Sequence, residues 1–340
     1  FFDGNKLFIT DSSNSRVLIY NSIPVANNAS ANIVVGQASM TANGGYAAVN
    51  KLSMPYSVFS DGEKLFIPDQ NNNRVLIYNE IPTENGASAD VVIGQNVFYS
   101  RVANNGGETV GNSSYWPMSS FYDGTRFFVA DTLNHRVLIY NSIPTENNAI
   151  ADVVIGQPDM VSNSPNQDGS PRANTLYEPR GVFSDGTRLL IADNLNHRVL
   201  IYNEIPTENN AEADLVIGQA DLTHNSSNRG GSVADNTLYQ PCIIYIVAGK
   251  VIVVDNHNNR VLIFNEIPTE NGASADVVIG QADFTHNSAN RGGSVANNTL
   301  YWPTSIYSDG DKLQIADFSN NRVLIFNEIP TENGASADVV

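Results

Sequence analysis

The chain repeats one sequence unit six times, and this periodicity limits its fold more than any other feature. Residues 131–157 read DTLNHRVLIYNSIPTENNAIADVVIGQ, and close variants of this stretch recur along the 340 residues. A marker arginine recurs in each copy, with a spacing of 58 residues once and of 62 residues four times, at Arg16, Arg74, Arg136, Arg198, Arg260 and Arg322. Repetition at a fixed period is typical of architectures in which each unit covers its apolar surfaces against its neighbours.

Each copy contains four short segments with the residue pattern of β-strands. In the fourth copy these are residues 181–184, 188–193, 198–202 and 213–218. The turn dipeptide Asp185-Gly186 separates the first two, as in tight hairpins, because glycine accepts a positive φ. Four strands joined in sequence by short turns predict one antiparallel meander per copy.

The third strand of each copy is apolar on both faces. It reads Arg-Val-Leu-Ile-Tyr or Arg-Val-Leu-Ile-Phe, so other sheets must cover it on either side. Radial stacking of four-stranded sheets provides this cover. We therefore predict an all-β fold, a six-bladed β-propeller with four antiparallel strands per blade; a linear solenoid is the alternative. The propeller is predicted to be a single domain over residues 1–340, with blades at approximately 1–37, 55–95, 117–157, 179–219, 241–281 and 303–340.

Charge and composition argue against several classes of partner. The formal net charge is −17, and such an acidic chain repels nucleic acids and anionic membranes. No apolar run is long enough to span a bilayer, so no membrane insertion is expected. A single cysteine, Cys242, excludes an intrachain disulfide framework. The chain opens at Phe1 within a repeat, so we expect its true start to lie outside this sequence, and we expect a secreted or cell-surface protein.

The turn before each marker arginine resembles the signature of NHL-repeat propellers. The motif Asp-x-x-Asn-x-Arg-Val occurs as residues 131–137 and again as residues 193–199, and the lead-in from Pro179 to Gly186 is also similar. The resemblance covers all six copies and implies a six-bladed propeller. It leaves the function open, because the family includes protein-binding and RNA-binding modules, extracellular sensor domains and a metal-dependent amidating lyase.

The Asp and Arg of this motif are predicted to be structural. Acidic side chains in tight turns accept hydrogen bonds from backbone N–H groups, and arginine pairs with acids or carbonyls nearby. A feature that appears identically in every blade is usually part of the blade. The predicted structural residues are Asp11, Arg16, Asp69, Arg74, Asp131, Arg136, Asp193, Arg198, Asp255, Arg260, Asp317 and Arg322.

Long polar loops connect the copies, for example residues 220–240 and 282–302. Loops of about 20 residues are uncommon in compact domains and are often functional. In a meander blade they emerge on the same face as the Asp-x-x-Asn-x-Arg turns, and this long-loop face is the predicted binding face. Aromatic and polar residues beside the lead-in prolines suit sugars or peptides. The predicted ligand-binding residues are Tyr56, Trp116, Glu178, Arg180, Gln240 and Trp302.

The sequence shows no catalytic constellation. Cys242 has no histidine assignable beside it, and His135 and His197 read as surface turn residues in equivalent positions. No His-x-x-His or His-Glu-x-x-His spacing occurs. We therefore predict no catalytic residue, no metal site and no cofactor. Calcium at residues 164–169 is the alternative, because oxygen-bearing side chains precede a glycine there at alternate positions.

The main functional prediction is a non-enzymatic NHL-type propeller, a binding or scaffolding module that acts outside the cell through its long-loop face. Its partner would be a protein, a peptide or a glycan, and a homo-oligomer or larger assembly is left open. Two alternatives remain: a six-bladed propeller hydrolase or lyase with a metal at the axial mouth, and a repeating structural subunit of an extracellular assembly.

Overall fold

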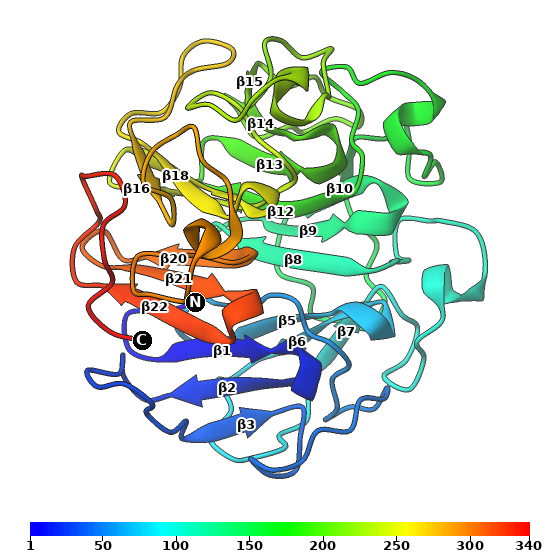
Figure 1. The fold of residues 1–340 in the computed structure, drawn as a ribbon. Helices are drawn as coiled ribbons and strands as arrows, with labels where there is room; N and C mark the ends of the chain where they lie inside the picture. Colours follow the sequence, from blue (N-terminus) through cyan, green and yellow to red (C-terminus); the bar gives the residue numbers. More distant parts are fainter. The chain divides into compact units, whose positions relative to one another are not determined.

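The computed structural model describes residues 1–340 and contains six antiparallel β-sheets and no α-helix. Within each sheet the strands lie in sequence order, so that each sheet is a meander (Figure 1). The chain is all-β and has the fold of a six-bladed β-propeller, as predicted. It contains no helix with the length and apolarity that a membrane span requires.

The second to fifth sheets have four strands each. They consist of β4 (Phe59–Ser60), β5 (Leu65–Asp69), β6 (Arg74–Tyr78) and β7 (Val91–Ile93); β8 (Pro117–Tyr122), β9 (Phe127–Asp131), β10 (Arg136–Tyr140) and β11 (Val153–Ile155); β12 (Pro179–Ser184), β13 (Leu189–Asp193), β14 (Arg198–Tyr202) and β15 (Leu215–Ile217); and β16 (Pro241–Val247), β17 (Lys250–Asp255), β18 (Arg260–Phe264) and β19 (Val277–Ile279).

The first and last sheets have three strands, where four were predicted. In the first sheet Phe2 forms only an isolated bridge with Leu7, and in the last sheet Val339 forms one with Ile325. A single bridging pair is too short a ladder to count as a strand. The strands of these sheets are β1 (Leu7–Asp11), β2 (Arg16–Tyr20) and β3 (Ile33–Val35), and β20 (Pro303–Ser308), β21 (Leu313–Asp317) and β22 (Arg322–Phe326).

A short 3-10 helix separates the two strands that carry the Asp and the Arg of each motif. The residue after it always has a left-handed backbone, for example His197 with φ 54° and Asn259 with φ 51°. Serine, asparagine and histidine occupy this position, and none is β-branched. These helices are η1 (Ser12–Asn14), η2 (Gln70–Asn72), η4 (Thr132–Asn134), η6 (Asn194–Asn196), η8 (Asn256–Asn258) and η10 (Phe318–Asn320); the long loops add η3 (Ala103–Gly106), η5 (Pro165–Asp168), η7 (Ser227–Gly230) and η9 (Ala289–Gly292).

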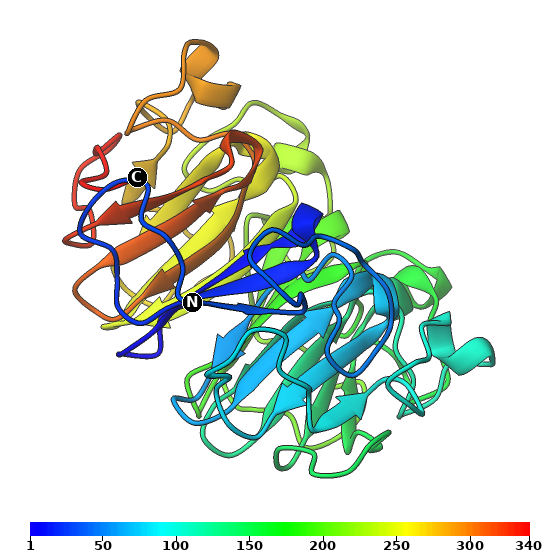
Figure 2. The ribbon, with the colours of Figure 1, turned by 90° about the horizontal axis from the view of Figure 1, so that it is seen from below.

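The chain forms two compact units, and each takes in a short segment from the other half of the sequence. The first comprises Phe1–Pro24, Ala29–Asp168 and Pro206–Ala211, and the second comprises Val25–Asn28, Gly169–Ile205 and Glu212–Val340. In the first unit, Asn209 Oδ1 accepts a hydrogen bond of 2.9 Å from Val154 N. In the second, Asn27 Oδ1 accepts one of 3.1 Å from Val340 N, at the carboxyl end that meets a blue loop in Figure 2. The exchanged segments are therefore anchored by the same kind of bond.

This contact, which we call the asparagine clasp, also recurs within each unit. An asparagine from the loop of one blade accepts a hydrogen bond from the outermost strand of the preceding blade. That strand is only three residues long, and an edge strand needs partners for its outward N–H groups. The further clasps join Asn85 to Val34, Asn147 to Val92, Asn271 to Val216 and Asn333 to Val278.

The hydrophobic core lies between neighbouring sheets of each unit. In the first unit the ring of Phe66 in β5 packs against Phe127 in β9, with ring centroids 5.0 Å apart. In the second unit Ile252 of β17 packs with Leu313 and Ile315 of β21. Burial of these faces is the main favourable contribution to folding, because apolar area leaves water on both sides of each inner sheet.

Candidate functional site

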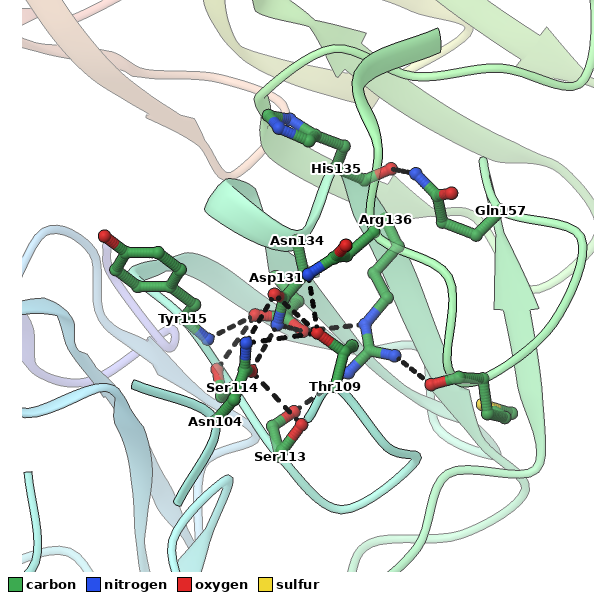
Figure 3. Close-up of polar contacts among 12 residues, drawn as sticks. Asn104, Thr109, Ser113, Ser114, Tyr115, Asp131, Asn134, His135, Arg136 and Gln157 are labelled. Carbon is green, nitrogen blue, oxygen red and sulfur yellow. Dashed lines mark hydrogen bonds and ion pairs between the residues drawn. The ribbon is translucent and has the colours of Figure 1, made fainter. Parts of the chain in front are cut away.

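The Asp-x-x-Asn-x-Arg turn forms a buried polar cluster, which Figure 3 shows for the third blade. Asp131 Oδ2 accepts hydrogen bonds from Arg136 Nε at 2.8 Å and from Asn134 Nδ2 at 2.7 Å. Its Oδ1 accepts bonds from the backbone N–H of Tyr115 at 2.7 Å and from the Ser114 hydroxyl at 3.1 Å. Both carboxylate oxygens therefore have donors from within the protein, as a buried charge requires.

The guanidinium of Arg136 links this turn to the loops on either side. Its Nη1 donates to the carbonyl of Met160 at 2.7 Å, and its Nη2 donates to the carbonyls of Val110 and Ser113 at 2.9 and 3.0 Å. The Asp–Arg pair is fully buried in the second to fifth blades and is partly exposed in the first and last. In the inner blades these side chains point into the protein and away from any ligand in solvent.

The residue before each lead-in proline also has a left-handed backbone, which the sequence analysis did not predict. The φ values lie between 50° and 55°, although residues other than glycine rarely adopt this conformation and a following proline restricts them further. The preceding turn holds the backbone in place: Asn259 Oδ1 accepts from Trp302 N at 2.9 Å, and His197 Nδ1 accepts from Gln240 N at 3.2 Å. The residues are Met54, Trp116, Glu178, Gln240 and Trp302.

The six predicted ligand-binding residues fall into two groups. Tyr56 and Trp116 belong to the first unit, where Trp116 is 37% exposed. The other four belong to the second unit, and they are Glu178, Arg180, Gln240 and Trp302. The structure gives this second group additional partners that the sequence analysis had not selected.

His257 lies at the centre of the group in the second unit. It belongs to η8, and its half-buried ring contacts the rings of Tyr239 and Trp302, with centroids 4.9 and 5.3 Å away. Its Nδ1 atom is buried and has no hydrogen-bond partner. Burial lowers the pKa of His257, and the positive charge of Arg180 lowers it further. The imidazole is therefore neutral at neutral pH, with one ring nitrogen unused.

Arg180 connects His257 with two further functional groups. Its Nη1 donates a hydrogen bond of 3.8 Å to the sulfur of Cys242, which is fully buried in β16. β12 can pack closely on β16 here because residue 181 is a glycine. A Cβ atom at Gly181 would lie only 2.5 Å from the carbonyl oxygen of Cys242. Burial raises the pKa of Glu178, and the charge of Arg180 opposes that rise without cancelling it.

His197 borders the same group and is not the surface turn residue that the sequence suggested. Its partly buried ring meets Tyr239 edge-on, with centroids 5.2 Å apart. Burial and the neighbouring His257 lower the pKa of His197 to about 4. The rings of His197, Tyr239, His257 and Trp302 thus follow one another across the second unit.

We call Glu178, Arg180, Tyr239, His257 and Trp302 the acid–base cluster, because its pKa shifts favour proton transfer. An ordinary glutamate, with a pKa of 4.5, is deprotonated before an ordinary histidine, with a pKa of 6.5, becomes neutral. Here the carboxyl pKa is raised and the imidazole pKa is lowered, so a larger share of molecules holds a protonated carboxyl and a neutral imidazole together. A poised acid and a poised base are what acid–base catalysis requires.

The side chains offer no ready metal centre. No group of three or more His, Cys, Asp or Glu side chains is arranged to hold a metal ion.

Comparison with known proteins finds matches among solved structures. No family model matches the sequence. No curated protein matches it either. A streptogramin B lyase structure is 10% identical, with a TM-score of 0.44, and the match covers 83% of this chain and 68% of that chain. A catalytically inactive histidine-to-alanine variant of virginiamycin B lyase from Staphylococcus aureus, solved with quinupristin, is 10% identical, with a TM-score of 0.45, and the match covers 95% and 77%.

Both neighbours are lyases by name, and the prediction of a non-enzymatic binding or scaffolding module is corrected on that finding, although a likeness this distant shows the fold alone. The prediction that the chain is not an enzyme is corrected with it. The sequence indicated Glu178 and Arg180, which flank Pro179, but not His257, because this histidine lies in another repeat and has no short spacing to them. Matches this distant transfer no substrate and no residue role, so the function must be argued from the chain's own side chains.

Proposed function

We propose that the protein is an acid–base enzyme of the lyase type, with His257 as general base and Glu178 as general acid. The observation that carries the proposal is the buried Nδ1 of a neutral His257, which has no hydrogen-bond partner in the protein. A buried polar atom without a partner is costly, and a catalytic role is one of the reasons for which a protein retains such an atom. Nδ1 is closed to solvent in this structure, so a substrate that gives its proton to it must first displace part of the packing around the ring.

The reaction best suited to these groups is a β-elimination. His257 removes a proton from the carbon next to a carbonyl or carboxylate group, and the guanidinium of Arg180 stabilises the negative charge that develops on the oxygen. Glu178 gives its proton to the oxygen that leaves from the adjacent carbon. One C–H bond and one C–O bond break, and a C=C bond forms between the two carbons.

Elimination is favoured over hydrolysis by the chemistry of the cluster. Hydrolysis through a covalent intermediate needs an accessible nucleophile, and Cys242, the only thiol, is fully buried behind Arg180. Elimination needs only a base, an acid and a cation. A hydrolase that activates water through His257 remains the second candidate.

The NHL-repeat assignment and the cellular location are part of this proposal. The Asp-x-x-Asn-x-Arg turn, with an Arg Nε to Asp Oδ2 contact of 2.7–2.8 Å in all six blades, supports membership of the NHL family. A location outside the cell is compatible with the single cysteine, because Cys242 is buried and can form no intrachain disulfide.

Deuterium incorporation tests the proposed chemistry. Lactones, cyclic depsipeptides and 4-linked uronate oligosaccharides are incubated with the protein in deuterium oxide, and NMR records exchange at the carbon next to the carbonyl. We expect His257→Gln to lower the rate at least about 100-fold, the usual contribution of a general base. The matched control is His286→Gln, because His286 is an exposed histidine of the same unit, paired with Asp283 at 2.7 Å. Absence of exchange and product across the panel, or full activity of His257→Gln, overturns the proposal.

A further inference from the structure

Trp302 presents an exposed aromatic surface beside the proposed catalytic groups. Its side chain is 43% exposed, and that of the adjacent Tyr301 is 38% exposed. The two rings meet at 63° with centroids 6.1 Å apart, while the indole also contacts His257. One part of the indole is therefore packed against the base, and another part is open to a ligand.

The protein holds the backbone that carries this indole in a fixed conformation. Trp302 N donates to Asn259 Oδ1, and the backbone of Trp302 has a φ of 51°. The next residue, Pro303, accepts a hydrogen bond of 2.8 Å from Asn256 Nδ2 through its carbonyl oxygen. A preorganised side chain loses little freedom when a ligand binds, so it can contribute most of its contact energy.

Trp116 has the same backbone setting as Trp302 but lacks the neighbouring histidine. It occupies the equivalent place in the first unit, with φ 55° and a hydrogen bond of 2.9 Å from its N–H to Asn73 Oδ1. The motif position that holds His257 in the fifth blade is occupied by Asn71 in the second. Only Trp302 therefore combines the exposed indole with the base, and Trp116 is a natural internal control.

An exposed, rigid indole is a typical platform for a sugar ring, whose C–H groups pack on the aromatic face. Within a glycan, a proton next to a carboxylate and a leaving oxygen on the adjacent carbon occur together at C5 and C4 of a 4-linked hexuronate. The acid–base cluster and the indole thus meet two requirements of one substrate class.

We propose that the second unit binds a glycan containing 4-linked hexuronate residues, with Trp302 stacked on one sugar ring and Arg180 paired with the carboxylate of the uronate beside it. This assignment rests on the proposed function and adds the class of substrate. In the reaction the C5–H and C4–O4 bonds break, a C4=C5 bond forms, His257 takes the C5 proton and Glu178 protonates O4.

The net charge of the chain further limits the class of glycan that it would bind. A net charge of −17 opposes the approach of a densely charged polyuronate, whereas the single guanidinium of Arg180 suits one carboxylate at a time. We therefore expect a glycan in which uronates alternate with neutral sugars. Three probes separate the cases: a hyaluronan hexasaccharide, which alternates glucuronate with N-acetylglucosamine, a hexagalacturonate, and the neutral cellohexaose.

Tryptophan fluorescence provides a direct test, because the chain has only two tryptophans. Trp116→Phe leaves Trp302 as the single reporter, and we expect the hyaluronan hexasaccharide to shift its emission. Trp302→Phe leaves Trp116 as reporter, and we expect no shift. By calorimetry with His257→Gln protein, which does not turn over, additional Trp302→Ala should weaken binding about tenfold. Additional Arg180→Gln should weaken it about tenfold to a hundredfold for hyaluronan and leave cellohexaose unaffected.

The outcomes separate this inference from the function on which it rests. Unchanged Trp302 emission with all three probes overturns the sugar site, and tighter binding of cellohexaose or hexagalacturonate overturns the alternating-uronate class. Binding that depends on Trp302 without ultraviolet absorption of a C4=C5 product supports the sugar site and contradicts the lyase. Product that forms equally well with Trp302→Ala supports the lyase and overturns the site.

Discussion

The Nδ1 atom of His197 accepts a hydrogen bond of 3.2 Å from the backbone N–H of Gln240. The bond joins the turn of one blade to the loop that enters the next, and it requires a neutral imidazole, because a protonated Nδ1 would itself be a donor. Asn259 Oδ1 makes the equivalent bond to Trp302 N at 2.9 Å. Equivalent positions in two repeats thus hold different acceptors: His197, which can be protonated, and Asn259, which cannot.

Replacing His197 by asparagine is expected to preserve stability at neutral pH and to reduce its loss in acid. The pKa of His197 falls from 6.5 to about 4 on folding, so the unfolded chain binds more protons between these values. Stability therefore decreases as the pH falls from about 6.5 through about 4. Urea unfolding of both proteins at about pH 7 and about pH 5 measures the difference. If the acid loss is the same in both, His197 is not the titrating group.

The proposed reaction is expected to lose rate on both sides of a pH optimum. In acid, His257 becomes protonated and stops acting as a base; as the pH rises through the raised pKa of Glu178, the general acid loses its proton. Glu178→Gln should remove the alkaline limb of the kcat profile and lower kcat about 100-fold. Glu204→Gln, an exposed glutamate of the same unit, serves as control. An alkaline limb that persists in Glu178→Gln would assign it to another group.

Removing one partner of a buried Asp–Arg pair is expected to be severe. Arg198→Met leaves the fully buried Asp193 without its guanidinium and should lower the free energy of unfolding by about 3–5 kcal/mol. Arg188→Met is the control, because the Arg188–Asp185 pair is partly exposed and should cost less than about 1 kcal/mol. Denaturant titration compares the two variants. Similar losses in both would contradict a special role for the buried pair.

Gly181 is expected to tolerate no side chain. A Cβ atom there would lie 2.5 Å from the carbonyl oxygen of Cys242 and 2.9 Å from Ile243 Cα, so Gly181→Ala must push β12 away from β16. We expect a loss of about 1–3 kcal/mol in the free energy of unfolding. Gly44→Ala is the control, since nothing lies within 4 Å of its added Cβ. Equal thermal stability of the two variants would show that the strands have room to separate.

Much of the fold could be predicted because each repeat encodes its blade locally. The apolar third strand, the Asp-Gly turn and the Asp-x-x-Asn-x-Arg turn are all contained within one copy. Gly186, for example, has the positive φ of 87° that its turn position indicated. The three-stranded first and last sheets were not predicted. The residues around Phe2 have the sequence pattern of a strand, but in the structure Phe2 forms only an isolated bridge with Leu7.

The candidate site could be predicted only in part. Glu178, Arg180 and Trp302 were selected because they flank the lead-in prolines, a position that the sequence shows directly. His257 was not selected, since its contact with Trp302 joins residues of different blades. Its lowered pKa also depends on burial and on the charge of Arg180, which no local spacing reveals. The signal in the sequence was that His257 is the only histidine at its motif position among the six copies.

The asparagine clasp has a consequence for how such a chain can evolve. Every inner repeat supplies an acceptor to the copy before it and a donor to the copy after it, as Asn271 and Val278 do on either side of the fifth blade. A newly duplicated stretch of gene would thus encode a repeat that can form these hydrogen bonds with the copies on both sides. Duplication of whole repeats would produce the constant interval between Arg74, Arg136, Arg198, Arg260 and Arg322. A chain that grew in this way would need no further substitutions at the contacts between its repeats.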